Sequence, residues 1–125
     1  MMMNYFKEQS EGKMEVNIYS IVGNSLCIEA EDGDKVFEFI KKILEQGNKA
    51  VISFLNVEML TSAFLNNAIG KLYGIFDEKQ IKKSLSVKDM SDEDKLLLKR
   101  VTDTAKAYYK DKEKVENIVN EVLGD

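Results

Sequence analysis

The sequence predicts a single α/β domain over residues 1–125: a small mixed β-sheet of about four strands, helices packed on it, and an added C-terminal helix. Three observations predict this class. Short segments with an alternating or continuous apolar pattern, typical of strands, are followed along the chain by longer segments whose apolar residues recur every three to four positions, typical of helices. The resulting order, β-β-α-β-α-β-α-α, is typical of layered α/β domains. The chain has 125 residues, 44% of them hydrophobic, which is enough to bury a core.

The first elements are read from turn signals and alternation. Residues 1–12 are polar and end in a glycine, so we expect a loose lead-in. Apolar and polar residues alternate over 14–19, which predicts a half-buried strand. A Gly-Asn-Ser turn at 23–25 is followed by a second alternating segment at 26–30. We interpret this second segment as the other strand of a hairpin; the alternative is a loop that leads directly into the next helix.

A helix and a central strand are predicted next. The Glu-Asp-Gly-Asp segment at 31–34 supplies candidate N-caps and negative charge at a helix start. Apolar residues then recur with helical spacing as far as Leu44, and Gly47 lies where a C-terminal cap glycine belongs. The apolar run at 50–54 is nearly continuous, which is typical of a strand covered on both faces.

A helix is predicted over 61–76, and one of its faces carries a line of small residues. Ala63, Asn67, Gly70 and Gly74 fall together at 100° per residue. Each glycine inside a helix costs about 1 kcal/mol relative to alanine, so we expect this line to let another backbone approach closely. Two interpretations stay open: a docking groove for a partner, or packing against the chain's own C-terminal helix.

The rest of the chain predicts one strand and two helices. Residues 81–87 read as a fourth strand, and Ser91, followed by three acids, is a helix start. The charged segment at 111–114 separates two apolar stripes, which suggests two helices within 91–125. Self-association through these helices is a further hypothesis.

Composition limits the chemistry of the chain. It has no histidine and one cysteine, so a zinc site or a Ser-His or Cys-His unit cannot be assembled from this chain alone. We therefore expect no enzyme activity, no cofactor and no metal. The net charge of −4, with acids and bases interleaved, argues against a nucleic-acid partner. No apolar run approaches the roughly 20 residues that cross a bilayer, and the start does not resemble a signal peptide, so we expect a cytoplasmic protein.

The segment at 50–76, AVISFLNVEMLTSAFLNNAIGKLYGIF, resembles the STAS fold of bacterial anti-sigma factor antagonists and sulphate transporter tails. Together with SDEDKLLLKRV further on, it resembles more closely the bacterial STAS-like family of unknown function, in which an apolar strand precedes a Thr-Ser-Ser-Phe-type helix start. The resemblance covers residues 14 to about 109. It implies a STAS-like fold and a regulatory module that binds another protein.

The resemblance also singles out one serine. In anti-sigma factor antagonists, the first serine of an Asp-Ser-Ser-Gly helix start is phosphorylated by a histidine-kinase-type ATPase. Ser62 matches that serine, while Thr61, Ala63 and Phe64 replace the other three residues. The resemblance therefore implies Ser62 as a candidate phosphoacceptor and such an ATPase as the candidate partner. The alternative is that Thr61 or Ser62 only caps the helix.

The sequence thus predicts a non-enzymatic regulatory module that docks a protein through the loop and helix at 55–74. The alternative is a small-ligand domain that binds a nucleotide or another anion at the N-terminus of the same helix. The residues that we expect at the binding surface are Asn56, Thr61, Ser62, Ala63, Asn66, Asn67, Gly70 and Gly74.

Overall fold

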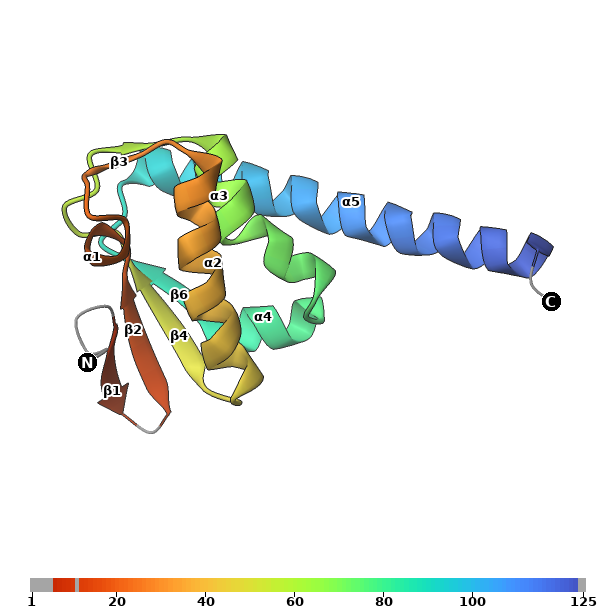
Figure 1. The fold of residues 1–125 in the computed structure, drawn as a ribbon, viewed down its shortest axis with the longest axis horizontal. Coiled ribbons are helices and arrows are strands. Elements are labelled where there is room, and N and C mark those ends of the chain that lie inside the picture. Colours follow the sequence, from red (N-terminus) through yellow and green to blue (C-terminus); the bar gives the residue numbers. More distant parts are fainter. Residues whose placement is uncertain (1–5, 11, 124–125) are drawn as a thin grey trace.

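The computed structural model describes residues 6–10 and 12–123 and has a mixed four-stranded sheet with helices packed on it (Figure 1). The sheet order is β1-β2-β4-β6, in which β1 runs antiparallel to β2 and the other neighbours are parallel. These strands are β1 (Phe6–Ser10), β2 (Lys13–Asn17), β4 (Lys49–Ser53) and β6 (Leu85–Lys88). The predicted α/β class, with a small mixed sheet and a long C-terminal helix, is confirmed.

A second, smaller sheet joins two loops at one end of the domain. In it β3 (Leu26–Cys27) pairs in parallel with β5 (Met59–Leu60). Hydrogen bonds from the backbone N–H groups of Glu58 and Met59 to the Ser25 carbonyl extend this pairing. The small sheet therefore fixes the chain segment just before α3 (Ser62–Ala68) against the segment just before α2 (Ala30–Glu45).

The strand register explains which side of the main sheet is buried. Val16, Ile52 and Val87 lie side by side across β2, β4 and β6, and Val16 and Ile52 are fully buried. The adjacent row, Glu15, Val51 and Ser86, points to the other face and is partly or fully exposed. Because β2, β4 and β6 are added in the same direction, their right-handed crossovers place the helices on one face. The prediction that the 50–54 strand is covered on both faces is therefore wrong.

Within residues 6–10 and 12–123, six helical segments complete the fold. Besides α2 and α3, they are α1 (Ile18–Val22), the 3-10 helix η1 (Gly70–Gly74), α4 (Glu78–Ser84) and α5 (Asp92–Leu123). In Figure 1, α2 lies in front of the sheet, and α5 starts over α3 and η1 and then runs out beyond the rest of the domain. The buried core contains side chains from the sheet and from α2, α3, η1 and α5.

The N-terminal third differs from the sequence prediction in two places. Residues 6–10 form an edge strand where a loose lead-in was expected; the remainder of that lead-in lies mostly outside the described residues. The predicted hairpin is also wrong, because α1 follows β2 directly and β3 pairs with β5 instead. Gly23 adopts φ 77° as the C-cap of α1, so its turn signal ends a short helix.

Three further differences lie in the second half. The helix predicted over 61–76 ends at Ala68 and continues as η1, so Gly70 and Gly74 bound a 3-10 segment. The first part of the strand predicted over 81–87 lies in α4 (Glu78–Ser84), and β6 begins only at Leu85. The two expected C-terminal helices are one continuous helix, α5, because the charged segment at 111–114 is an exposed stretch of good helix formers. The Ser91 hydroxyl accepts a hydrogen bond from the Asp94 N–H, as its capping pattern predicts.

A glycine brings α2 and α3 unusually close together. Gly33 lies in the first turns of α2, and a Cβ placed there would lie 2.4 Å from the Phe64 carbonyl oxygen and 3.1 Å from the Ala68 nitrogen. Both atoms belong to the backbone of α3, so neither can move aside unless the whole helix moves. Sequence reasoning placed Gly33 in a cap; its role is to let two helices meet.

Candidate functional site

The loop between β4 and β5 is held in place at the carboxyl ends of two parallel strands. The buried Ser53 hydroxyl donates a hydrogen bond to Asp89 Oδ2 at 3.0 Å and accepts one from the Leu55 N–H at 3.3 Å. Asn56 follows with φ 68°, a left-handed conformation that asparagine tolerates better than most residues. Its side chain is exposed, so the loop presents Asn56 to solvent from a fixed backbone.

Thr61, and not Ser62, caps α3. The Thr61 hydroxyl accepts a hydrogen bond from the Phe64 N–H at 3.2 Å and donates one to the Ile28 carbonyl at 2.7 Å. One side chain therefore starts α3 and ties it to the β3–α2 connection. Ser62 is the first residue of α3 and is exposed, so its hydroxyl does not serve as the cap.

Exposed apolar side chains surround this helix start. Leu26 and Met59 are directly paired across β3 and β5, and their side chains are 44% and 52% exposed. Leu55, in the preceding loop, is 53% exposed. We call these three residues together with Asn56, Ser62, Ala63 and Asn66 the β3–β5 surface; all seven are exposed. Sequence reasoning missed this pair because it interpreted residues 26–30 as the second strand of a hairpin, which pairs Leu26 with the preceding strand and not with Met59.

A shallow hollow lies beside Ser62, between α3 and α5. It has a volume of about 220 Å³ and is lined by Ser62, Asn66, Arg100, Val101 and Thr104. Arg100, on α5, is exposed, so its guanidinium is the cationic group that shares this hollow with the serine hydroxyl. The fold therefore brings together an exposed hydroxyl and a permanent positive charge.

The small residues of the predicted stripe have different neighbours. Gly70 is buried, and a Cβ placed there would lie 2.6 Å from Asn66 Oδ1 and 3.5 Å from the Ala105 Cβ of α5. A Cβ at Gly74 would lie 2.4 Å from the Tyr109 ring. Both glycines therefore face α5, which agrees with the interpretation of packing against the chain's own helix. Ala63 is exposed and belongs to the β3–β5 surface.

Asn67 connects α3 to α2 through a polar cluster. Its Nδ2 donates to Asp34 Oδ1 at 3.0 Å, and Lys71 Nζ donates to the same oxygen at 2.7 Å. The hydrogen bond from Lys71, with the smaller contribution of Asn67, holds the pKa of Asp34 below its usual value. Lys71 Nζ also lies 4.7 Å from the centre of the Phe37 ring. Asn67 thus has an internal role in this structure.

One comparison with known proteins gives a match. A family model described as a STAS-like domain of unknown function matches residues 32–95, just over half of the chain. The chain belongs to this family. The sequence-based identification is thereby confirmed. The comparisons with curated proteins and with solved structures gave no significant match.

The family match runs from α2 to the first residues of α5 and includes the helix start at Thr61. Most of the β3–β5 surface lies within it, while Leu26 and Arg100 lie outside. The rest of α5, beyond Lys95, is an addition to the matched STAS-like region.

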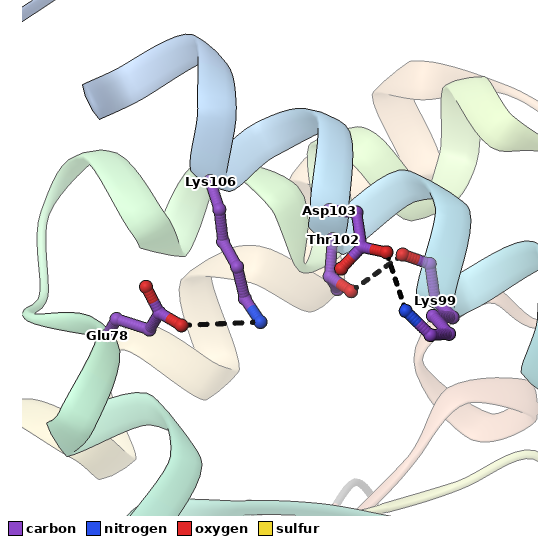
Figure 2. Close-up of polar contacts among 5 residues, drawn as sticks. All are labelled: Glu78, Lys99, Thr102, Asp103 and Lys106. Atoms are coloured by element: carbon purple, nitrogen blue, oxygen red, sulfur yellow. Dashed lines mark hydrogen bonds and ion pairs between the residues drawn. The ribbon is translucent and has the colours of Figure 1, made fainter. Parts of the chain in front are cut away.

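Two clefts lie along α5 on the side of η1 and β6. One, of about 450 Å³, separates α5 from β6; the other, of about 440 Å³, lies where α5 leaves the domain. Figure 2 shows the polar side chains around them: Lys106 Nζ lies 3.5 Å from Glu78 Oε2, and Lys99 Nζ lies 2.7 Å from Asp103 Oδ2. The charged side chains that line the two clefts are evenly divided between acidic (Asp77, Glu78, Asp103, Glu113 and Glu116) and basic (Lys95, Lys99, Lys106, Lys110 and Lys112). Taken together, the two clefts of the STAS-like domain therefore have no excess charge of one sign.

The described residues also limit what else this STAS-like domain can hold. Among them, no three histidine, cysteine, aspartate or glutamate side chains are close enough together to bind a metal ion. None of the helices within residues 6–10 and 12–123 is both long and apolar enough to cross a membrane. Cys27 is fully buried, and its burial, with the nearby Asp32, raises the pKa of its thiol to about 11. A thiol with this pKa is a poor nucleophile at neutral pH.

Proposed function

We propose that this STAS-like domain is a non-enzymatic regulatory module that binds a partner protein through the β3–β5 surface. The observation that supports this most directly is the exposed Leu26–Met59 pair beside the start of α3. Paired apolar side chains on a backbone held by the small β3–β5 sheet form a preorganised contact area, and such exposed apolar groups mark interaction sites. Asn56, Ser62 and Asn66 add hydrogen-bonding groups around them, which is the usual arrangement of an interface.

The partner that the STAS resemblance suggests is a histidine-kinase-type ATPase, and the cytoplasm of a bacterium is the compartment in which the two would meet. Leu26, Leu55 and Met59 would fill apolar pockets of that partner. The other residues of the predicted set each have a contact inside the domain, so they would support the surface from within; they are Thr61, Asn67, Gly70 and Gly74.

Ser62 is the residue at which this binding would be regulated. Thr61 performs the capping role, so modification of the exposed Ser62 hydroxyl would not remove the helix cap. A phosphoryl group carries between about −1.5 and −2 charges at pH 7 and accepts hydrogen bonds from arginine. Arg100 borders the same hollow and is positioned to pair with it, and the added charge would weaken contact with an apolar partner surface.

The anion-binding alternative has less support. α3 extends only over Ser62–Ala68, and the Phe64 N–H at its start is already bonded to Thr61. Few free N–H groups therefore remain to bind a phosphate, and the helix dipole of so short a segment is small.

Photo-cross-linking in the native cell tests the docking proposal. A photoreactive residue at Met59 should capture one defined protein, and the same residue at Ile75, which is 51% exposed on the η1–α4 connection, is the matched control. Binding of the purified, captured protein is then measured by calorimetry against Met59→Glu, Leu26→Glu and Ile75→Glu. We expect the first two substitutions to weaken binding at least about tenfold, since each places a charge in an apolar contact, and Ile75→Glu to leave it unchanged. Equal affinity for all three variants would refute the proposed surface.

The regulatory step has a separate test. Ser62→Glu should weaken the same binding while Ser62→Ala should not, and mass spectrometry of the protein from its host should find phosphate on Ser62. If Ser62→Glu binds as well as the unmodified protein, then the regulation is wrong even where the docking surface is right.

A further inference from the structure

The outer edge of β6 carries main-chain groups that the domain does not use. β6 ends the main sheet, and the Lys88 carbonyl accepts a hydrogen bond from the residue after β4, so Lys88 turns its main-chain groups toward β4. Alternate residues of a strand bond to the same neighbour, so Ser86 does likewise, while Leu85 and Val87 face outward. The Leu85 N–H bonds to the Ile81 carbonyl. Within residues 6–10 and 12–123, the Leu85 carbonyl and both main-chain groups of Val87 have no hydrogen-bond partner.

The cleft of about 450 Å³ between α5 and β6 runs along this edge. Its lining includes three consecutive residues of β6, which are Leu85, Ser86 and Val87. Consecutive side chains point to opposite faces of a sheet, so a space that all three residues border lies beside the edge and not over one face. The unused main-chain groups therefore open into the cleft.

One face of α5 forms the opposite wall of the cleft. Its lining residues have the spacing i, i+3, i+4, i+7, i+8, i+11, and Figure 2 shows four of them on the same side of the helix. They are Lys95, Leu98, Lys99, Thr102, Asp103 and Lys106. This face extends over about 17 Å, which is the length of about five residues of an extended chain.

The walls of the cleft combine apolar groups with positive charge. The charged lining residues are three lysines and one aspartate. The aspartate is paired with Lys99, and Glu78 from outside the cleft contacts Lys106, whereas Lys95 forms no ion pair with the described residues. The apolar lining on the helix side consists of Ile69, Tyr73 and Leu98.

We propose that this cleft binds an extended, acidic segment of a partner protein, which adds to the sheet as a further strand beside β6. Free N–H and C=O groups along a sheet edge are satisfied by another extended chain, and the side chains of that chain then contact the groove walls. The excess of lysines selects acidic side chains in the segment. The α5 wall closes the far side of the cleft, which favours a single chain segment over the edge of a second folded sheet.

This binding does not rest on the function proposed above. The cleft shares no residue with the β3–β5 surface, so each of the two sites can fail its test without affecting the other.

An NMR titration tests the proposal with a defined probe, the acetylated and amidated peptide Glu-Thr-Val-Thr-Val-Glu. We expect binding in the millimolar range or tighter, with the largest changes at the amide signals of Val87 and Leu98. The same peptide with lysine in place of both glutamates should bind at least about threefold more weakly. An unchanged Val87 signal at saturating solubility of the probe, or changes confined to the β3–β5 surface, would overturn the proposal.

Methylation of the peptide nitrogens tests the main-chain pairing. Two further probes carry N-methyl groups on one or the other alternate set of residues. The set that faces β6 should lose binding by at least about tenfold, because a donor is removed and the methyl group occupies the space between the strands, while the other set should stay within about twofold. Equal losses for the two probes would show that the segment does not pair as a strand.

Substitutions in the protein supply the matching test. Val87→Pro removes the outward N–H and no bond to β4, since proline is tolerated where a strand edge is free, and should weaken binding at least about fivefold relative to Val87→Ala. Lys95→Glu should weaken it at least about threefold, and Lys114→Glu, which makes the same charge change on α5 outside the cleft, should not.

Circular dichroism checks that each variant is folded, and if Val87→Pro is not, the methylated probes decide the main-chain pairing. Equal affinities of Lys95→Glu and Lys114→Glu would refute the choice of an acidic segment. A dimer in light scattering that Val87→Pro dissociates would place a second copy at this edge and overturn the proposal.

Discussion

Replacing Gly33 with alanine tests whether the contact between α2 and α3 depends on the absence of a side chain. The added methyl would lie 2.4 Å from the Phe64 carbonyl oxygen, whereas ordinary van der Waals contact begins at 3.4 Å. The two helices must therefore separate by about 1 Å. Because the atoms in the way belong to the backbone, no side-chain rotation relieves the clash.

The size of the effect follows from two opposing contributions. Overpacking of this kind costs about 1–3 kcal/mol, and we take the upper end because backbone must move. Alanine in a helix is favoured over glycine by about 1 kcal/mol, which offsets part of that cost. Gly33 does not adopt a left-handed conformation, so no backbone strain adds to the sum. We expect a net loss of about 2 kcal/mol in unfolding free energy, or about 6–10 °C in Tm.

Urea unfolding followed by circular dichroism measures this loss. Glu38→Ala, on the exposed side of the same helix, is the control and should change the unfolding free energy by less than about 0.5 kcal/mol. If Gly33→Ala proves as stable as the parent protein or more so, then the helices can separate freely and the close contact is not a constraint on the fold.

Three further outcomes are expected from groups at and near the site. Thr61→Ala should lower the unfolding free energy measured in urea by about 1–2 kcal/mol, because it removes both the helix cap and the hydrogen bond to the Ile28 carbonyl. Ser62→Ala should change it by less than about 0.5 kcal/mol. Equal effects of the two substitutions would contradict the assignment of Thr61 as the cap. At pH 8, Cys27 should react with a thiol reagent about 200-fold more slowly in the native protein than in urea, because a pKa of about 11 leaves little thiolate. Fast labelling of the native protein would refute the burial of Cys27. Burial, with Glu78 and Asp103, raises the pKa of Tyr73, so the native state binds its proton more tightly than the unfolded state. Stability should therefore fall as pH rises above about 10, and more steeply than in Tyr73→Phe, as measured by urea unfolding at each pH; parallel pH profiles would contradict this.

The sequence predicted the layered architecture because that depends on hydrophobic periodicity within single segments. The β4 strand and the α2 helix were identified from such patterns, and β4 lies within one residue of its predicted position. The helix start was placed too late, because α2 begins at Ala30 and already contains the segment at 31–34 that was predicted to cap it. The apolar run at 50–54 nevertheless led to one wrong prediction, that both faces of this strand are covered. Its Val51 points to the open face of the sheet, and a partly exposed valine has the same sequence signal as a buried one.

The site depended on contacts between distant segments, which periodicity does not report. Leu26 meets Met59 only because β3 pairs with β5 rather than with β2. Gly33 meets α3 only through the crossing of two helices, and in the sequence it looks like a loop glycine. In the same way, a hydroxyl at either Thr61 or Ser62 can cap a helix, and only the position of the Ile28 carbonyl decides for Thr61. The docking surface at 55–74 was proposed from the local pattern of that segment, and it stays a prediction.

The direction in which α5 leaves the domain determines how binding surfaces would be spaced. In Figure 1, β3 lies at one end of the domain and α5 extends from the other. Because α5 is one continuous helix, its outer half is a stiff extension that does not shorten or bend as a flexible linker does. A partner that contacted both the β3–β5 surface and the outer half of α5 would gain from the second contact only where its own spacing matches this span, since a rigid connection permits no adjustment. The helix would then select among partners by their geometry.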